Sequence, residues 1–167
     1  GAPARVACGR ARPGPPVSCF GRVGLDLIGE HCVQLVQQRG VDSSALQRDQ
    51  DRPSRIVLVR RSQEGERELQ GFAGDRGQGF ADQALGPVML PQGARWLLVG
   101  TIPLATNPSA STLKAALDQA RQHQMSIALD VNWRPTFWDA TADPGAGPSS
   151  DAIAVMRPLL EQAALIK

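Results

Sequence analysis

The sequence contains no apolar run approaching the roughly 18 residues that a membrane-spanning helix requires. We therefore predict that the chain has no membrane-spanning helix. It also lacks a strong excess of either charge. The formal net charge is +2 at pH 7, which is too small to indicate binding to nucleic acid or to a membrane surface. The first residues show no signal-peptide pattern. We therefore expect a cytoplasmic protein that binds neither nucleic acids nor membranes.

Cysteine and histidine are scarce, and neither is arranged as a metal site. Cys8, Cys19 and Cys32 are an odd number without metal-ligand spacing, which is typical of small buried residues in a reducing compartment. His31 has no partner at ligand spacing, and His123 falls in the last turn of an expected helix, where a cation suits the helix dipole. The sequence therefore predicts no metal ligands and gives neither histidine a catalytic role.

What the sequence does contain is typical of one globular domain. Its 167 residues are enough for a hydrophobic core, and hydrophobic residues make up 42% of them. Strand patterns alternate with helix patterns, which predicts an α/β layered domain with a mostly parallel sheet and a small β excursion. Helices are expected at 1–12, 26–39, 108–123 and 151–163, and strands at 17–20, 54–61, 67–72, 95–100, 126–130 and from 165 onward.

The connections between these elements are predicted from turn and cap residues. Residues 21–24 are predicted to be a tight connection and residues 41–53 a polar connector. Asp26 can cap the helix that follows it, and Gly40 can end that helix. The apolar face expected on this helix is formed by Ile28, Cys32, Leu35 and Val36. Residues 54–74 are predicted to form a charged hairpin, which is marginal alone and should pack on something, for example a second copy of the chain.

The most informative stretch runs from residue 130 to residue 138 and follows the apolar run 126–129. This pattern indicates a buried parallel strand whose carboxyl end opens into a polar site. In an extended segment Asp130, Asn132 and Arg134 would point to one side, and Pro135 helps to keep the segment extended. The three could bind sugar hydroxyls, a cation through water, or an anion. The alternative is a structural capping acid that is paired with the arginine.

Two glycine-containing segments are further candidates for a binding site. Residues 1–12 resemble a loop entering a helix, whose free N–H groups could bind a polar ligand; a plain helix start is the alternative. Residues 71–79 contain four glycines, one aspartate and one arginine, so the backbone could approach a ligand; a flexible surface loop is the alternative. The second segment is neither a Walker loop nor a dinucleotide-binding loop.

Four motifs, in order along nearly the whole chain, resemble the ribokinase-like carbohydrate kinases of the phosphofructokinase B type, and among them most of all the fructokinases. Residues 1–7 resemble the sugar-binding loop Gly-Gly-Ala-Pro-Ala-Asn-Val-Ala. Residues 21–29 resemble the pattern Gly-x-Val-Gly-x-Asp-x-x-Gly, and residues 65–67 resemble the turn of the lid hairpin. Residues 130–138 resemble Asp-Pro-Asn-Leu-Arg-Pro-x-x-Trp.

The resemblance implies a three-layer α/β/α fold with a mostly parallel sheet and a small β-hairpin lid, at about 54–74, that often forms a dimer clasp. It implies a reaction in which ATP with Mg²⁺ donates a phosphoryl group to a sugar hydroxyl, with catalysis mostly by positioning and charge stabilisation. The substrate-binding residues that it implies here are Gly1, Ala2, Arg5, Arg76, Asp130, Asn132 and Arg134.

The chain departs from the family pattern at several positions. Arg5 stands where the family has a sugar-binding asparagine, and Leu25 stands where many relatives have an acid. Val131 replaces a proline, and Pro13 occupies a position that is usually an apolar helix residue. These replacements leave open the alternative that the chain is a catalytically inactive relative that binds only a sugar or a partner.

The resemblance covers roughly the first half of such a kinase, so we expect a domain that is incomplete at both ends. The family's first strand would precede Gly1, and the motifs for Mg²⁺, for the anion hole and for the catalytic aspartate would follow Lys167. The ATP-binding half, the ATP and Mg²⁺ sites and the catalytic residue are therefore expected outside these residues, and the 167-residue chain alone is predicted to be inactive. Within the enzyme class, a 2-keto-3-deoxygluconate kinase or a nucleoside kinase are the alternatives.

Overall fold

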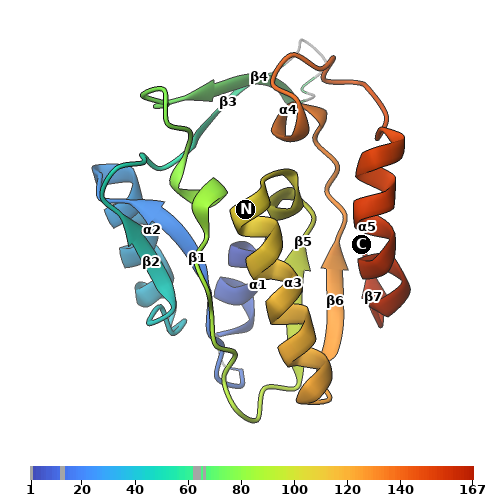
Figure 1. Cartoon of the computed structure of the whole chain (residues 1–167). Coiled ribbons are helices and arrows are strands. Elements are labelled where there is room, and N and C mark those ends of the chain that lie inside the picture. The colour runs from blue at the N-terminus through green and yellow to red at the C-terminus, as the bar shows by residue number, and fades with distance from the viewer. Residues whose placement is uncertain (1, 12–13, 62–64, 66) are drawn as a thin grey trace.

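The computed structural model describes residues 2–11, 14–61, 65 and 67–167 (Figure 1). The helices are α1 (Ala2–Arg10), α2 (Leu27–Gln38), α3 (Asn107–Gln122), α4 (Pro135–Trp138) and α5 (Ser150–Gln162), with 3₁₀ turns η1 (Ala81–Ala84) and η2 (Ile102–Ala105). The strands are β1 (Gly21–Gly24), β2 (Leu46–Asp49), β3 (Ile56–Arg61), β4 (Arg67–Ala73), β5 (Trp96–Gly100), β6 (Ser126–Asp130) and β7 (Leu165–Ile166).

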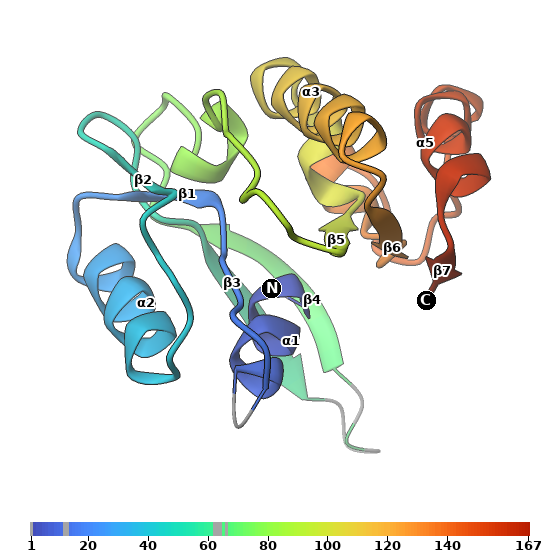
Figure 2. The same cartoon turned by 90° about the horizontal axis from the view of Figure 1, so that it is seen from below.

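The strands form two parallel groups and one antiparallel hairpin. Strands β5, β6 and β7 pair in parallel in that order, and β1 pairs in parallel with β2. Helices α1 and α2 lie on one face of these strands and α3 and α5 on the other (Figure 2). Strands β3 and β4 pair antiparallel, with a register shift between Leu58 and Val59. The predicted three-layer α/β/α arrangement with a mostly parallel sheet is thus confirmed.

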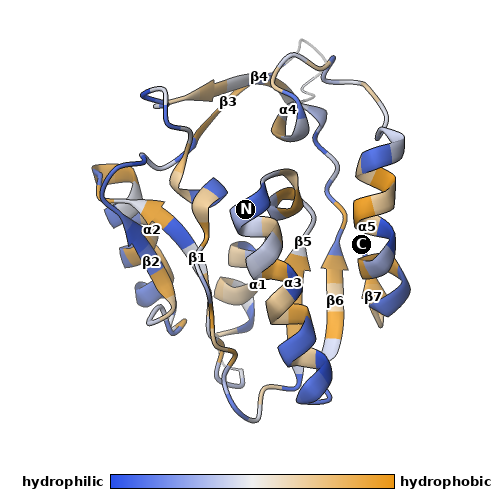
Figure 3. Ribbon diagram, viewed as in Figure 1, coloured by the Kyte–Doolittle hydropathy of each residue, from blue (hydrophilic) through white to orange (hydrophobic). Residues whose placement is uncertain are grey.

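The main hydrophobic core lies around β5, β6 and α3. Figure 3 shows β5 and β6 as hydrophobic. Strand β6 is buried from Ile127 onward, whereas β5 buries only Leu97 and Val99. Helix α3 buries the face that its 3.6-residue periodicity predicts, with Leu113 only 2% exposed. The buried residues of this face include Leu113, Ala116, Leu117 and Ala120.

Helix α2 confirms its predicted caps but not its predicted buried face. The side chain of Asp26 accepts a hydrogen bond from the N–H of Gly29 at 2.7 Å, and Gly40 has a φ of +74°. Val36 is 8% exposed, whereas Ile28 is 45% and Leu35 43% exposed, because no described element covers that side of the helix. The buried environment predicted for the cysteines is also wrong at Cys32, which is exposed.

Strand β1 replaces the tight connection predicted at 21–24. Its four residues pair with β2, which lies within the predicted polar connector, while the predicted strand at 17–20 contributes only a bridge between Ser18 and Asp42. Gly24 is needed in this strand, because a Cβ there would lie 2.5–2.8 Å from atoms of the chain that follows, including the backbone N of Ser54. The close packing of β1 against residues 52–54 therefore explains why this strand contains glycine and lacks the usual apolar alternation.

A buried carboxylate joins β1 to β2. Asp49, at the end of β2, is 1% exposed, and its Oδ2 lies 2.7 Å from Nε of Arg22. Its Oδ1 accepts hydrogen bonds from the N–H groups of Arg52 at 2.8 Å and Asp51 at 3.0 Å. Burial raises the pKa of Asp49, but these two N–H groups and the Arg22 guanidinium outweigh it, so the net pKa lies below the ordinary value.

We expect the free energy of unfolding to fall in acid because of Asp49. A lowered folded-state pKa stabilises the fold above the unfolded pKa of about 3.9, and this contribution is lost as the pH falls through the folded-state value. Replacing Asp49→Asn should cost about 1 kcal/mol at neutral pH. Urea unfolding between neutral and acid pH would measure both effects. A variant as acid-sensitive as the unaltered chain would contradict this account.

Candidate functional site

The candidate site lies at the carboxyl end of β6, as predicted. Strand β6 is buried from Ile127 onward and ends at Asp130, which is 8% exposed. Among the residues that the structure describes, none forms a hydrogen bond or an ion pair with the Asp130 carboxylate. Its carboxylate oxygens keep contact with solvent, so they are available to accept hydrogen bonds from a ligand.

The segment after Asp130 is not extended throughout. Asn132 has a φ of +28°, in the left-handed region, which interrupts the alternation of side chains. The extended geometry from which we predicted that Asp130, Asn132 and Arg134 share one side is therefore absent. Arg134 itself is extended before Pro135, as predicted, but it is exposed and its Nη1 donates to the carbonyl of Trp133 at 2.7 Å.

Two backbone features hold this segment in place. The buried Thr101, which follows β5, donates a hydrogen bond from its Oγ1 to the carbonyl oxygen of Val131. Pro135 then begins the short helix α4, where its fixed φ suits a first helical position. We did not predict α4, although a proline at this position is compatible with a helix start. The segment after β6 is thus hydrogen-bonded to the end of β5 and is followed directly by α4.

The start of α1 lies beside these strand ends. A Cβ placed on Gly100, the last residue of β5, would lie 3.6 Å from the carbonyl oxygen of Asp130 and 3.9 Å from Cγ of Pro3. The first turn of α1 therefore lies near the Asp130 backbone, at the end of the sheet where ligands collect. The predicted contact Gly1 falls outside the described residues, as does the side chain of Ala2, whereas Arg5 is exposed.

The glycine-rich loop after β4 is organised by its own aspartate. Oδ1 of Asp75 accepts hydrogen bonds from the N–H groups of Gly77 at 2.8 Å and Gly79 at 2.9 Å. Both glycines have positive φ, at +88° and +77°, which explains why glycine occurs at these positions. Arg76 is exposed, and within the described part of the chain it forms no hydrogen bond or ion pair.

The β3–β4 hairpin lies at the end of the molecule toward which β5 and β6 point (Figure 1). The side chains of β3 are exposed along its whole length, including four consecutive apolar residues, of which Val59 is 52% exposed. Apolar side chains on both faces of a two-stranded hairpin are unusual without a covering partner. The hairpin therefore offers an apolar surface beside the candidate site.

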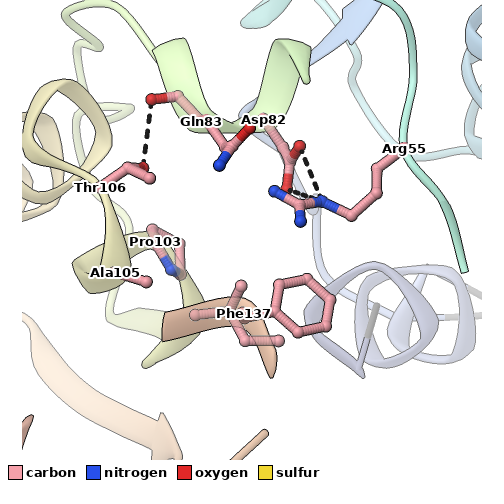
Figure 4. Close-up of a pocket in the computed structure, with 8 residues that line it drawn as sticks. Arg55, Asp82, Gln83, Pro103, Ala105, Thr106 and Phe137 are labelled. Atoms are coloured by element: carbon pink, nitrogen blue, oxygen red, sulfur yellow. Dashed lines mark hydrogen bonds and ion pairs between the residues drawn. The ribbon is translucent and has the colours of Figure 1, made fainter. Parts of the chain in front are cut away.

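A cluster centred on Arg55, which precedes β3, was not predicted from the sequence. Its Nε lies 3.2 Å and 3.1 Å from the two carboxylate oxygens of Asp82, an ion pair that Figure 4 shows beside Phe137. Its guanidinium lies over the rings of Phe72, Phe80 and Phe137. Arg55 also lines a cavity of about 50 Å³ together with Asp82 and Phe137. The phenylalanines lie far apart in the sequence and share no period, so only the fold brings them together.

The described residues do not form a metal site. No three of their histidine, cysteine, aspartate or glutamate side chains gather where they could hold a metal ion. A divalent ion that acts with ATP therefore does not fit the donors found among the described residues. Within the same residues, no helix is long and apolar enough to cross a membrane.

Comparison with solved structures assigns the class of fold. The apo fructokinase of Vibrio cholerae O395 matches with a TM-score of 0.80 and 30% identity, over 99% of this chain and 54% of that one. The same enzyme solved with fructose, ADP and calcium ion matches with a TM-score of 0.78 and 28% identity, over 99% of this chain and 51% of that one. The fold is that of the ribokinase-like fructokinases.

Sequence comparison assigns the family. The model of the pfkB family carbohydrate kinase matches residues 1–153. The fructokinase of Salmonella typhimurium is 35% identical over 144 residues, which are 85% of this chain and 46% of that protein. The chain thus spans about half the length of the curated relatives that it matches. This protein belongs to the pfkB family of carbohydrate kinases.

Proposed function

We propose that the protein to which this chain belongs transfers a phosphoryl group from ATP to a hydroxyl of a fructose-like sugar. In this proposal the chain supplies the sugar side of the site, with the β3–β4 hairpin as its lid. The observation that carries the proposal is Asp130 at the end of β6, beside the start of α1, whose solvent-accessible carboxylate has no partner among the described residues. Similarity to a fructokinase solved with fructose and ADP supports the choice of sugar and nucleotide.

The proposed contacts follow from the chemistry of the side chains. An ionised carboxylate only accepts hydrogen bonds, so Asp130 is suited to hold sugar hydroxyls, and the amide of Asn132 can both donate and accept. Arg134 is exposed and carries a cation, which is suited to an anionic group that approaches the strand end. Arg5, Arg76 and the backbone at Gly1 and Ala2 remain predicted contacts. ATP would supply the phosphoryl group from outside the residues described here.

The test is a phosphoryl-transfer assay with ATP, Mg²⁺ and D-fructose on two proteins. One is the product of the complete reading frame that contains these residues, and the other is the 167-residue chain. We expect sugar phosphate from the first and none from the second. Lack of transfer to any of a panel of hexoses by the first protein would contradict the proposal, and transfer by the second would contradict the predicted inactivity of the chain alone.

We also propose that the lid pairs with the lid of a second copy. Its exposed apolar side chains on β3 support this, because a self-complementary contact between two hairpins would remove them from water. The four side chains concerned are Ile56, Val57, Leu58 and Val59.

Replacing Val59→Lys is expected to raise the dimer dissociation constant at least about tenfold, because each dimer would bury two new charges. Sedimentation equilibrium over a range of concentrations would measure it. Met89→Lys is the control, because Met89 is 88% exposed and lies outside the hairpin. A chain that stays monomeric without any substitution would contradict the proposal.

A further inference from the structure

We propose that Arg55 is a positioning residue that fixes the base of the lid to α4, the helix that follows the candidate sugar site. This inference rests on the proposed function. Its side chain is only 9% exposed. The guanidinium carbon lies 4.6 Å from the ring centroid of Phe72, 4.5 Å from that of Phe80 and 4.6 Å from that of Phe137. Three aromatic rings within contact of one buried cation form a specific cation–π arrangement.

The three rings belong to three different parts of the fold. Phe72 lies in β4, on the second strand of the lid, and Phe80 precedes η1. Phe137 lies in α4 and meets Phe72 edge-on, with their ring centroids 4.6 Å apart. Arg55 itself precedes the first lid strand. One side chain, immediately before β3, therefore contacts β4 of the hairpin, the η1 turn and the helix that follows the candidate site.

This contact matters for the sugar site because of where α4 begins. The helix starts at Pro135, immediately after the segment from Asp130 to Arg134, so the position of Phe137 constrains the far end of that segment. The path from lid to site is short and continuous: Arg55 contacts Phe137, and Phe137 lies in the turn that ends the segment. Movement of the lid base away from this cluster would release the segment as well.

Arg55 is not placed to contact the sugar itself. The cavity beside it has a volume of about 50 Å³, well below the roughly 300–1,000 Å³ that is typical of ligand pockets. The two carboxylate oxygens of Asp82 already accept from Nε of Arg55, so the cation is partly neutralised. The geometry therefore favours a role in holding the lid over a role in binding substrate.

The magnitudes indicate which contacts matter more. The Asp82 side chain is 40% exposed, and an ion pair with an exposed partner contributes little. Contacts between a desolvated cation and aromatic faces are stronger. We therefore expect Arg55→Met, which removes the cation but keeps an unbranched apolar stem, to have a larger effect than Asp82→Asn. Arg55→Lys should lie between Arg55→Met and the unaltered chain, because it keeps the charge but loses the planar group.

The experiment combines amide hydrogen exchange with titration of D-fructose, both on the 167-residue chain. For Arg55→Met we expect exchange in β3 and β4 to become at least about tenfold faster, and the dissociation constant for D-fructose to rise by at least about tenfold. Exchange in α3 and β6 reports whether each variant is folded. Arg61→Met is the matched control, because Arg61 is exposed at the far end of β3, the strand that Arg55 precedes.

The outcomes separate this inference from the proposed function. Fructose binding that is equal in the unaltered chain and in Arg55→Met would overturn the positioning role, whatever the lid exchange shows. An equal loss of fructose affinity in Arg61→Met would overturn the positioning role as well. No fructose binding by the unaltered chain would instead contradict the proposed function. If Arg55→Met does not fold, the same comparison is made with Arg55→Lys, which must weaken fructose binding and speed lid exchange for the inference to stand.

Discussion

Replacing Asp130→Ala is expected to weaken D-fructose binding about tenfold to hundredfold, because hydrogen bonds to a charged group are the stronger kind. The same change should alter the free energy of unfolding by at most about 0.5 kcal/mol, because the carboxylate reaches solvent and has no partner among the described residues. Weaker binding with unchanged stability would distinguish a ligand-binding carboxylate from a structural one. Fructose titration and urea unfolding measure the two quantities.

The control for Asp130 is Asp151→Ala, on helix α5. Asp151 is an exposed acid in the first turn of that helix, so its removal should leave fructose binding unchanged and slightly lower stability. If Asp130→Ala binds fructose as tightly as the unaltered chain, the carboxylate is not a sugar contact. If Asp130→Ala is instead strongly destabilised, the carboxylate has a structural partner in solution.

Replacing Leu129→Ala is expected to lower the free energy of unfolding by about 2–5 kcal/mol. Leu129 lies in β6, is 1% exposed and belongs to the main core cluster, so its truncation leaves a cavity between the strands and α3. Small domains are stable by only about 5–15 kcal/mol, and several apolar side chains of this chain are exposed. The loss is therefore a large fraction of the total, and urea unfolding would measure it.

Leu27→Ala is the matched control for this prediction, because it truncates the same side chain where it is 89% exposed. We expect a change of at most about 0.5 kcal/mol there. A similar shift of the urea midpoint in both leucine variants would show that the core is not centred on β6. A shift only in Leu27→Ala would mean that α2 is covered in solution.

The strands at 95–100 and 126–130 and the helix at 108–123 were predicted because their patterns are strong. Leu97 and Val99 are buried as the strand pattern requires, and α3 buries the face that a 3.6-residue period selects. The caps of α2 were also predicted, because Asp26 and Gly40 each act on backbone within a few residues of themselves. Where a pattern repeats or a cap forms within a few residues, the sequence was sufficient to predict the structure.

Strand β1 was not predictable in this way, because its identity depends on distant contacts. Gly21 and Gly24 make up half of its residues and are typical of turns. Only the close approach of residues 52–54 to Gly24, and pairing with β2, make this segment a strand. The prediction that the apolar face of α2 is buried was wrong for a related reason. The periodicity is that of a helix, but no described element lies against Ile28 or Leu35.

The candidate site was predicted in part. The polar end of a buried strand placed Asp130 correctly, because a buried apolar run that ends in an acid is a local signal. The left-handed φ of Asn132 has no such signal, and it altered the direction of the residues that follow. Arg55 was missed because its three aromatic partners are brought together only by the fold. The roles of Arg5, Arg76, Asn132 and Arg134 in substrate binding remain predictions.

The most direct test of this account is to titrate the isotope-labelled 167-residue chain with D-fructose and to follow its amide resonances. We predict saturable changes at residues 130–134, in the first turn of α1 and in the β3–β4 hairpin, with α5 and β2 unaffected. These changes should require much more sugar in Asp130→Ala. No change at any sugar concentration that keeps the chain folded, or changes confined to other regions, would contradict the proposal that the carboxyl end of β6 is a sugar site.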